Sequence, residues 1–455
     1  MIEEIKNFLV DLQKKDVLKK VLKNSGWLFF DNFYRLFGSL FIFALVARYL
    51  GPSEFGLLNY SIAFSTIFTS LSSFGLDGVV VKMLSQKKYD ENIILGNSFI
   101  LRIIGSLISI FLVFISISYI KPYDHNLVLM AVIVSVSYLV SSFYVIDWWF
   151  QSKVNSKYVV ISKCIAFTVL SVLKIVLVLN SAKVIWFAIT ILLETCITVI
   201  SLLYFFLKIN NWKISWKVDN YILKILAKSG LPLIASGLFV YIQSYIDQIM
   251  LGTLVNSYEV GQYSVAMRIT NVFDFIPMIL FSSLLPIVSK YKEENENKYL
   301  WIIMKIYQLM LIIFIAIFVP IVVLSKPFIL LMYGESYIKS AYIMSLLGFR
   351  FLFTVLGVTR SMYILSDNKY KYTMVTSLIG VIINVLMNMV LIPRIGSYGS
   401  VLSSVISLMF SIVVIDYINK DTRKYVKMLI KSIIKIKSFG DFSIKDYFKY
   451  DGSEN

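Results

Sequence analysis

The chain has 455 residues, of which 58% are hydrophobic and only 16% are charged, and its mean hydropathy is +0.77. A soluble domain would carry about 25% charged residues, so the composition excludes an ordinary soluble enzyme. The net charge of +17 fits the basic inner loops of a membrane protein better than nucleic-acid binding. Two cysteines and one histidine, His125, are too few for a disulfide framework or a zinc site, and we expect neither a metal nor another cofactor.

Twelve apolar stretches are long enough to span a bilayer, which predicts an all-α polytopic membrane protein. In chain order they cover residues 26–46, 57–77, 96–119, 127–149, 158–179, 184–207, 229–251, 261–287, 301–324, 341–365, 372–392 and 398–418. With the N-terminus inside, 30 of the 44 lysines and arginines fall on the inner side and 6 in outer turns. This asymmetry supports the count of twelve spans and predicts that both termini lie on the inner, cytoplasmic side of the membrane.

The longest basic inner loop, residues 208–228, divides the chain into six-helix lobes at 26–207 and 229–418. The two lobes resemble copies of a repeat, because each contains the same ordered pattern. The pattern is a Leu-Gly pair, then a Gly, then a Tyr-Ser-apolar-Ala run, and its parts recur 201 to 205 residues apart. These are Leu50-Gly51, Gly56 and Tyr60 to Ala63, and Leu251-Gly252, Gly261 and Tyr263 to Ala266. Copies with an even number of spans share one orientation, which predicts a pseudo-two-fold axis along the membrane normal. A chance match of common membrane-helix residues is the alternative.

Both ends of the chain carry helical amphipathic patterns: the cytoplasmic N-terminal segment 1–25 and the basic cytoplasmic tail 419–455. We expect these segments to lie on the anionic lipids of the inner leaflet, with partner binding as the alternative. The apolar positions are Ile5, Phe8, Leu9 and Leu12 at the N-terminus, and Val426, Leu429, Ile430 and Ile433, opposite Lys424, Lys427, Lys431 and Lys435, in the tail.

Charged residues inside the spans are the candidates for a substrate or ion pathway, because a charge in the bilayer is costly. Lys305, Arg360 and Asp147 lie near span ends, where we expect them to reach the interface. The remaining basic residues outnumber the acids and predict a cationic cavity that binds an anionic head group such as phosphate. They are Arg35, Arg102, Lys163, Lys174, Arg268 and Arg350. Asp31 lies four residues before Arg35, so mutual neutralisation is the alternative there.

Two acids, Asp247 and Glu194, are the candidates for ion coupling, with structural pairing to an intramembrane basic residue as the alternative. Polar residues at helical spacing line either the cavity or interhelical hydrogen-bonded seams. They are Gln243, Asn271, Asn384 and Asn388. Aromatic residues are candidates for stacking on sugars, although Trp and Tyr near span ends are more often interfacial. They are Trp148, Trp149, Tyr241 and Tyr245.

Several short motifs, in order, resemble those of polysaccharide-biosynthesis flippases. They are Arg48-Tyr49-Leu50-Gly51-Pro52 with Gly56, Asp247 to Gly252, Met332-Tyr333-Gly334-Glu335-Ser336-Tyr337, Asn384 to Asn388, and Ile392-Pro393-Arg394-Ile395-Gly396 with Gly399. The resemblance covers about residues 20–420. Asn388-Met389 and Ser400 stand where many relatives carry smaller residues, a departure that concerns packing. The family is the O-antigen or capsule repeat-unit flippases of the multidrug/oligosaccharidyl-lipid/polysaccharide exporter superfamily.

The resemblance implies a two-lobed, twelve-helix bundle that moves undecaprenyl-pyrophosphate-linked oligosaccharides from the inner to the outer leaflet by alternating access. It also implies lipid-linked oligosaccharide and other polysaccharide assembly proteins as partners, and no enzymatic activity. A cation-coupled drug or metabolite antiporter of the same superfamily is the alternative. A glycan polymerase or ligase fits less well, because the outer turns are short. The sequence contains no Gly-Lys-Ser/Thr phosphate-binding loop, which argues against an ATPase motor in this chain.

Overall fold

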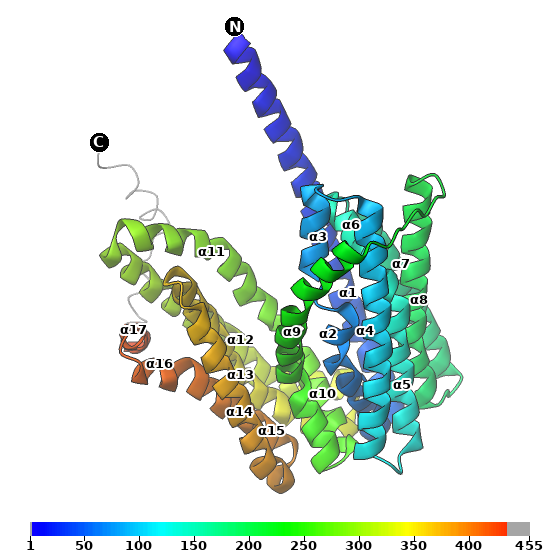
Figure 1. Ribbon diagram of the computed structural model, residues 1–455. Helices are drawn as coiled ribbons and strands as arrows, with labels where there is room; N and C mark the ends of the chain where they lie inside the picture. The colour runs from blue at the N-terminus through cyan, green and yellow to red at the C-terminus, as the bar shows by residue number, and fades with distance from the viewer. Residues whose placement is uncertain (1, 435–455) are drawn as a thin grey trace. The chain divides into compact units, whose positions relative to one another are not determined.

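The computed structural model describes the backbone of residues 2–434 and the side chains of residues 23–369 and 371–434. Over this part of the chain the structure is helical and contains no strand (Figure 1). Eleven helical segments among the described residues are long and apolar enough to cross a membrane. The predicted all-α polytopic fold is therefore confirmed, and the chain is a multi-pass membrane protein.

Nine helices and one 3-10 turn precede residue 255 in the described chain. They are α1 (Ile2–Ile67), α2 (Thr69–Ser73), α3 (Asp77–Gln86), α4 (Glu91–Ile120), α5 (His125–Val140), η1 (Ser141–Tyr144), α6 (Val145–Ser152), α7 (Lys157–Leu179), α8 (Val184–Ile209) and α9 (Asn220–Leu254). The later elements are α10 (Ser257–Thr270), η2 (Asn271–Asp274), α11 (Phe275–Glu294), α12 (Glu296–Tyr333), η3 (Glu335–Tyr337), α13 (Ile338–Ser366), α14 (Tyr370–Ile395), α15 (Ser397–Met409), the π-helical η4 (Phe410–Val414), α16 (Ile415–Ile418) and α17 (Arg423–Ile434).

The first two predicted spans lie in one long helix, α1, that is interrupted at Gly51. Gly51 has φ 70° and ψ 168°, a backbone conformation that glycine tolerates and other residues rarely adopt. Pro52 follows, and proline suits the first turn of a new helix because its missing N–H has no helical partner there. Once α1 is divided at Gly51, the eleven apolar segments account for all twelve predicted spans. The predicted span 57–77 is not continuous, because α1 ends at Ile67 and left-handed Phe74 ends α2.

The chain divides into two compact units, Met1–Gly261 and Gln262–Asn455. The first has a hydrophobic core that includes Trp148, Phe150 and Leu202, and the core of the second includes Tyr307 and Met310. The division falls inside α10, so α9, the seventh predicted span, packs with the first six. The lobe boundary at residues 208–228 stays a prediction.

Residues 210–219, in the predicted linker, are packed against the first unit. The Trp216 ring lies 5.1 Å from the Phe99 ring, and the Lys217 amide donates to the carbonyl oxygen of Asn92 at 3.2 Å. Asp219 then caps α9 by accepting from the amides of Tyr221 and Ile222. These contacts explain why α9 is held beside α4 within the first unit.

The part of α1 that follows its break lies directly against the start of α10 within the first unit. A Cβ atom on Gly56 would lie 1.7 Å from the carbonyl oxygen of Ser257, and one on Gly261 would lie 2.0 Å from that of Pro52. A step of four residues from Pro52 to Gly56 is matched by a step of four in the opposite direction from Gly261 to Ser257, the pattern of two helices that cross antiparallel. Any antiparallel crossing gives this pattern, so the duplication stays a prediction.

We expect Gly56→Ala to destabilise the protein, because the added methyl group overlaps backbone rather than a mobile side chain. Overpacking of this kind costs about 1–3 kcal/mol. Gly78→Ala is the matched control, since nothing lies within 4 Å of a Cβ atom built at Gly78. The midpoint of thermal unfolding in detergent measures both variants. Equal midpoints for Gly56→Ala and Gly78→Ala would contradict the close crossing.

Helix α17 carries the amphipathic pattern of the tail, and its apolar residues lie on two faces. Val426 and Leu429 are buried in the protein, and Ser432 donates to the carbonyl oxygen of Met304 in α12. The expectation that Val426 and Leu429 lie on lipid is therefore wrong, because α12 covers them. Ile430 and Ile433 are half-exposed. The side chains of Ile5, Phe8, Leu9 and Leu12, and the whole of Lys435, lie outside the described residues.

Candidate functional site

The first unit contains a polar cavity of about 680 Å³, here called the Arg102 cavity. Helices α2 to α6, α8 and α9 contribute to its wall, together with η1. Its charged residues are Asp77 and Lys82 on α3, Arg102 on α4 and Asp147 on α6. A cavity of this volume with a few converging polar groups is typical of a small-molecule or head-group site.

Arg102 is the most deeply buried basic group of the cavity, with 4% of its surface exposed. Its Nη2 donates to Ser141 Oγ at 3.2 Å. The guanidinium carbon lies 4.8 Å from the ring centre of Trp148 and 5.9 Å from that of Tyr144, which are cation–π distances. The Nε atom is buried and has no hydrogen-bond partner among the described residues. Arg102 is therefore a buried guanidinium on the cavity wall with one N–H that no described residue satisfies.

The 3-10 turn η1 positions two of the three groups that contact Arg102. Helix α5 tightens at Ser141, and this turn carries Ser141 and Tyr144 toward α4. Trp148 follows one turn later on α6. A 3-10 stretch within a longer helix often marks a functional hinge or a strained sequence. Sequence reasoning placed Arg102 in a cavity, but the hydropathy pattern carries no signal for this turn.

Asp147 is a buried member of the cavity wall, which corrects the prediction that it reaches the interface. It accepts from Lys163 Nζ at 3.2 Å and from Gln151 Nε2 at 2.9 Å. Neighbouring helices α3 and α8 cover this end of α6, so its proximity to the span end does not bring it to water. The Lys163 charge is consequently matched by a carboxylate and contributes less positive potential to the cavity than Arg102 does.

Two other predicted cavity residues of the first unit also pair with acids. Lys174 on α7 lies 3.7 Å from Glu194 on α8, and Arg35 lies 2.9 Å from Asp31 on α1. None of these four residues lines the Arg102 cavity. The geometry therefore favours a structural pair for Lys174 and Glu194, and Glu194 as an ion-coupling group stays a prediction.

We expect exchange of the two charges, in the double variant Lys174→Glu with Glu194→Lys, to preserve transport. Either single variant places like charges side by side at membrane depth and is expected to lower the amount of folded protein several-fold. Quantitative membrane expression and a transport assay on all three variants measure the effect. A double variant that is folded but inactive would instead show that Glu194 itself takes part in transport.

Helix α9 brings one aromatic candidate to the cavity, since Tyr241 lines it. Gln243 is exposed, and Asp247 is half-buried one turn further on. Neither of these two side chains belongs to the cavity wall. Their assignment to a substrate or ion pathway stays a prediction.

In the second unit the structure places two predicted basic residues on neighbouring segments. Arg268 on α10 is exposed, and so is Asn271 at the start of η2. Arg350 on α13 is half-buried and directs its Nη1 toward the sulfur atom of Met267, 3.2 Å away. Arg350 thus lies beside the turn of α10 that carries Arg268.

Asn384 and Asn388 lie in an interhelical contact between α14 and α15. Asn388 Nδ2 donates to Asn384 Oδ1 at 3.1 Å, and Asn384 Nδ2 donates to Ser404 Oγ at 3.4 Å. Both amides are buried. This arrangement is a hydrogen-bonded seam, the alternative considered for these residues.

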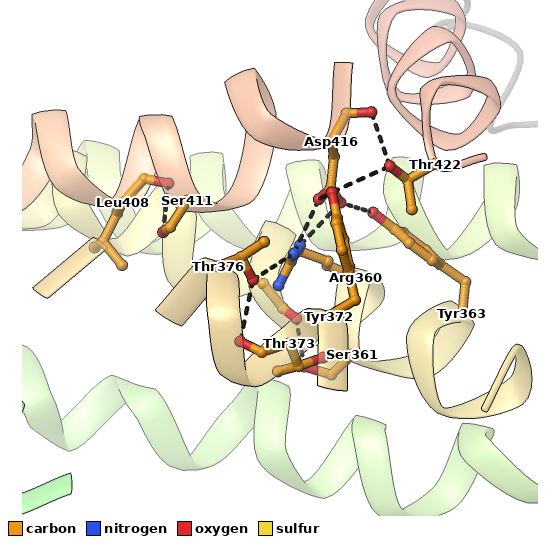
Figure 2. Close-up of polar contacts among 11 residues, drawn as sticks. Arg360, Ser361, Tyr363, Tyr372, Thr373, Thr376, Leu408, Ser411, Asp416 and Thr422 are labelled. Atoms are coloured by element: carbon orange, nitrogen blue, oxygen red, sulfur yellow. Dashed lines mark hydrogen bonds and ion pairs between the residues drawn. The ribbon is translucent and has the colours of Figure 1, made fainter. Parts of the chain in front are cut away.

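Arg360 forms the most highly connected buried ion pair of the second unit's described residues, with Asp416 (Figure 2). Its Nε and Nη2 donate to the two oxygens of Asp416, each at 2.9 Å, and Nη2 also donates to Thr376. The hydroxyls of Tyr363 and Tyr372 donate to the same carboxylate. Asp416 is fully buried and Arg360 is 6% exposed. The expectation that Arg360 reaches the interface is therefore wrong.

Sequence reasoning missed this cluster because Asp416 was not counted among the acids of the last span. The available signal was spacing: Tyr363 follows Arg360 by three residues, and Thr376 follows Tyr372 by four, so each pair shares a helix face. The π-helical turn η4 then sets the direction of Asp416. Such turns are common at functional sites.

Lys305, the third residue expected at the interface, is also buried, with 8% exposed. Its ammonium lies 5.7 Å from the ring centre of Trp301. The surrounding α12 residues are packed in the core of the second unit. The prediction that Lys305 reaches the interface, made from its place near the end of a span, is therefore wrong.

A second polar cluster holds α17 against α11, α12 and the end of α13 in the second unit. Tyr425 Oη donates to Asp367 Oδ2 at 2.9 Å and lies 3.2 Å from Tyr299 Oη. Lys292 Nζ lies 2.8 Å from Asp367 Oδ1. Burial, followed by the contact with Tyr299, raises the pKa of Tyr425 above its ordinary value, so its hydroxyl remains a donor at neutral pH.

The membrane-length helices and the polar cavity among them are those of a polytopic membrane transporter. The family model described as "Polysaccharide biosynthesis protein" matches residues 21–292, more than half of the chain, and the MatE model matches residues 232–390. The chain belongs to the polysaccharide biosynthesis protein family, within the superfamily that also includes the multidrug exporters. It is a transporter of the flippase class linked to polysaccharide biosynthesis.

Two kinds of relative support this placement. The chain is 22% identical to the capsular polysaccharide biosynthesis protein CapF of Staphylococcus aureus over 88% of its own length and 99% of that protein. The lipid II flippase MurJ in an inward closed conformation matches with a TM-score of 0.69 and 16% identity, over 93% of each chain. An inward-facing multidrug resistance MATE transporter matches at 0.64 and 15%, over 91% of this chain and 96% of that one. The latter two show the shared fold.

Proposed function

We propose that this protein flips undecaprenyl-pyrophosphate-linked oligosaccharide repeat units from the inner to the outer leaflet of a bacterial inner membrane. The product would feed O-antigen or capsule assembly. The relation to CapF, which covers nearly the whole of that protein, supports the link to a surface polysaccharide. The fold is shared with MurJ, which is described as a lipid II flippase, and this supports a lipid-linked substrate.

The observation that carries the proposal is the unpartnered donor of Arg102. A guanidinium binds phosphate through paired N–H groups and keeps its charge at every physiological pH. Arg102 already uses Nη2 on Ser141 and leaves the buried Nε without a partner among the described residues. Arg102 lines the cavity, so its guanidinium is the group that we propose binds a phosphate oxygen there.

The aromatic walls of the cavity support a sugar-bearing substrate. The guanidinium of Arg102 lies over the rings of Trp148 and Tyr144, and Tyr241 adds a third ring to the lining. The lining also offers hydroxyl and amide groups, from Ser73, Thr195 and Gln151, that can bond to sugar hydroxyls. A phosphate anchored at Arg102 with sugars along these groups fits a lipid-linked oligosaccharide head group.

In this proposal the lobes expose the cavity to one side of the membrane and then the other, by alternating access. Both termini face the cytoplasm, where the basic ends contact anionic lipids and other polysaccharide assembly proteins are the natural partners. The remaining basic residues, Arg268 and Arg350, are proposed to extend the substrate path in the second unit. The protein performs no chemical step on the glycan.

A cation-coupled antiporter is the second candidate function, and the match of the MatE model to residues 232–390 favours it. Antiporters of cationic drugs need an unpaired carboxylate in the substrate cavity. In the Arg102 cavity Asp147 is engaged by Lys163, whereas Asp77 is exposed at the start of α3. Efflux of cationic dyes from cells, compared between wild type and Asp77→Asn, separates this function from glycan flipping.

A deletion strain tests the proposed function. We expect lipid-linked oligosaccharide to accumulate on the cytoplasmic leaflet, where an impermeant lectin or sugar-oxidising probe applied from outside does not reach it. The wild-type gene, supplied on a plasmid, restores accessibility. Unchanged exposure of the glycan on the outer leaflet of the deletion strain would refute flipping and favour the antiporter.

A further inference from the structure

A second cavity of the first unit, about 400 Å³ in volume, is an apolar groove between α1 and α7. We call it the α1–α7 groove. Trp27 and Phe30 form its α1 side, and the α7 side runs from Val160 to Val169. It includes Ile161 and Cys164 and shares no lining residue with the Arg102 cavity. The transport site therefore does not account for it.

Contacts between the two helices close the groove at both ends. At one end Asn24 Oδ1 accepts from the backbone amide of Ser156 at 2.7 Å, just before α7 begins. At the other end Tyr34 Oη and Thr168 Oγ1 lie 2.9 Å apart. The opening between these contacts is consequently a bounded feature of the helix pair, rather than a general separation of two helices.

The two ends of the groove differ in charge, because Arg35 at the Tyr34 end is neutralised by Asp31 at 2.9 Å, whereas a lysine stands at the other end. Lys157 begins α7, and its Nζ lies 5.9 Å from the ring centre of Trp27. The other lysines of α7, Lys163 and Lys174, pair with Asp147 and Glu194, but among the described residues no carboxylate pairs with Lys157. The N-terminus of a helix adds further positive potential at this point. This end of the groove is therefore suited to an anion.

The length of the groove matches one leaflet. From Lys157 to Val169 the helix rises about 18 Å, at 1.5 Å per residue, and half of a bilayer's hydrocarbon core is about 15 Å. Lys157 is at the helix end, where Trp27 provides the aromatic side chain typical of a membrane interface. A hydrocarbon chain in the groove thus starts at the interface and ends near the bilayer centre.

We propose that the α1–α7 groove binds one acyl chain of an anionic bilayer phospholipid, with the phosphate beside Lys157. The bounded apolar opening accepts the chain, and the uncompensated lysine selects the head group. Binding fastens α1 to α7 on the lipid-facing side of the first unit. The assignment does not depend on the proposed transport function, because the groove is separate from the Arg102 cavity.

Photo-crosslinking of the full-length protein in phosphatidylcholine nanodiscs tests this assignment. The probe is phosphatidylglycerol with a diazirine on its acyl chain, and mass spectrometry locates the adducts. We expect adducts at residues 27–30 and 160–169 of the wild-type protein. Adducts confined to other parts of the chain, or equal labelling of the groove by the matching phosphatidylcholine probe, would overturn the proposal.

Two variants with matched controls sharpen the test. Ile161→Trp fills the groove and is expected to remove most groove adducts, whereas Val172→Trp, at an exposed position of the same helix outside the groove, leaves them. Lys157→Gln is expected to lower phosphatidylglycerol labelling about fivefold, the effect of one lysine near an anionic surface, and Lys183→Gln to leave it unchanged. Groove labelling that is insensitive to both Ile161→Trp and Lys157→Gln overturns the assignment. A competition experiment can overturn it as well. If unlabelled undecaprenyl phosphate displaces the probe at concentrations at which unlabelled phosphatidylglycerol does not, the occupant of the groove is the substrate lipid.

Discussion

Replacing Arg102 with alanine is expected to lower export of the lipid-linked glycan about 10- to 100-fold. A hydrogen bond to a charged group contributes about 1.5–3 kcal/mol, and each 1.4 kcal/mol is a factor of ten in affinity. The alanine variant loses both the charge and the N–H donors of the guanidinium that lines the cavity. The initial rate of appearance of glycan on the outer leaflet, at equal protein level, measures the effect.

Two further variants distinguish loss of binding from loss of folding. Arg102→Lys keeps the charge but loses the paired N–H geometry and the stacking on Trp148, so we expect partial activity. Arg394→Ala removes the same side chain from an exposed position at the end of α14 and is expected to leave export unchanged. Full activity of a stably folded Arg102→Ala protein would refute the proposed anion site.

Loss of the Arg360 side chain is expected to be the most destabilising single change in the second unit. Arg360→Met leaves the fully buried Asp416 carboxylate without its counter-charge. Breaking a buried ion pair in this way costs about 3–5 kcal/mol. The midpoint of thermal unfolding, and the amount of monodisperse protein extracted in detergent, measure the loss.

The double variant Arg360→Met with Asp416→Leu separates a structural pair from a substrate-binding arginine. Removing both charges avoids the uncompensated carboxylate, so we expect stability to recover most of the loss. Lys290→Met, which breaks the half-exposed pair with Glu294, is the control and is expected to change stability by less than about 1 kcal/mol. A stable Arg360→Met protein that fails to export glycan would instead place Arg360 in the transport path.

The membrane spans could be predicted from the sequence because each span depends on the hydropathy of its own segment and not on contacts with other segments. The break at Gly51 could also be located, since the Gly-Pro pair ends one helix and starts the next. The course of residues 67–77 was not predictable from apolar content, because the end of α2 depends on left-handed Phe74 and Gly75. The packing of α9 with the first unit depends on contacts between distant segments, such as Tyr60 with Thr253.

The site was harder to predict because depth in a span does not tell which side chain faces which neighbour. Charge alone placed Arg102, Lys163 and Lys174 together, yet only Arg102 lines the cavity. Asp147 and Arg360 were expected at the interface from their place along the spans, but neighbouring helices cover both. The partner of each charge lies on another helix, and its identity becomes visible only in the folded structure.

The most direct test of the account is flipping by the purified protein in liposomes. A fluorescent lipid-linked oligosaccharide is placed in both leaflets, and a membrane-impermeant quencher reports the fraction that reaches the outside over time. We predict faster exchange with the wild-type protein than with Arg102→Ala or with empty liposomes, and no such difference between wild type and Arg394→Ala. Equal exchange in wild-type, Arg102→Ala and empty liposomes would contradict the central claim that the Arg102 cavity moves a lipid-linked glycan.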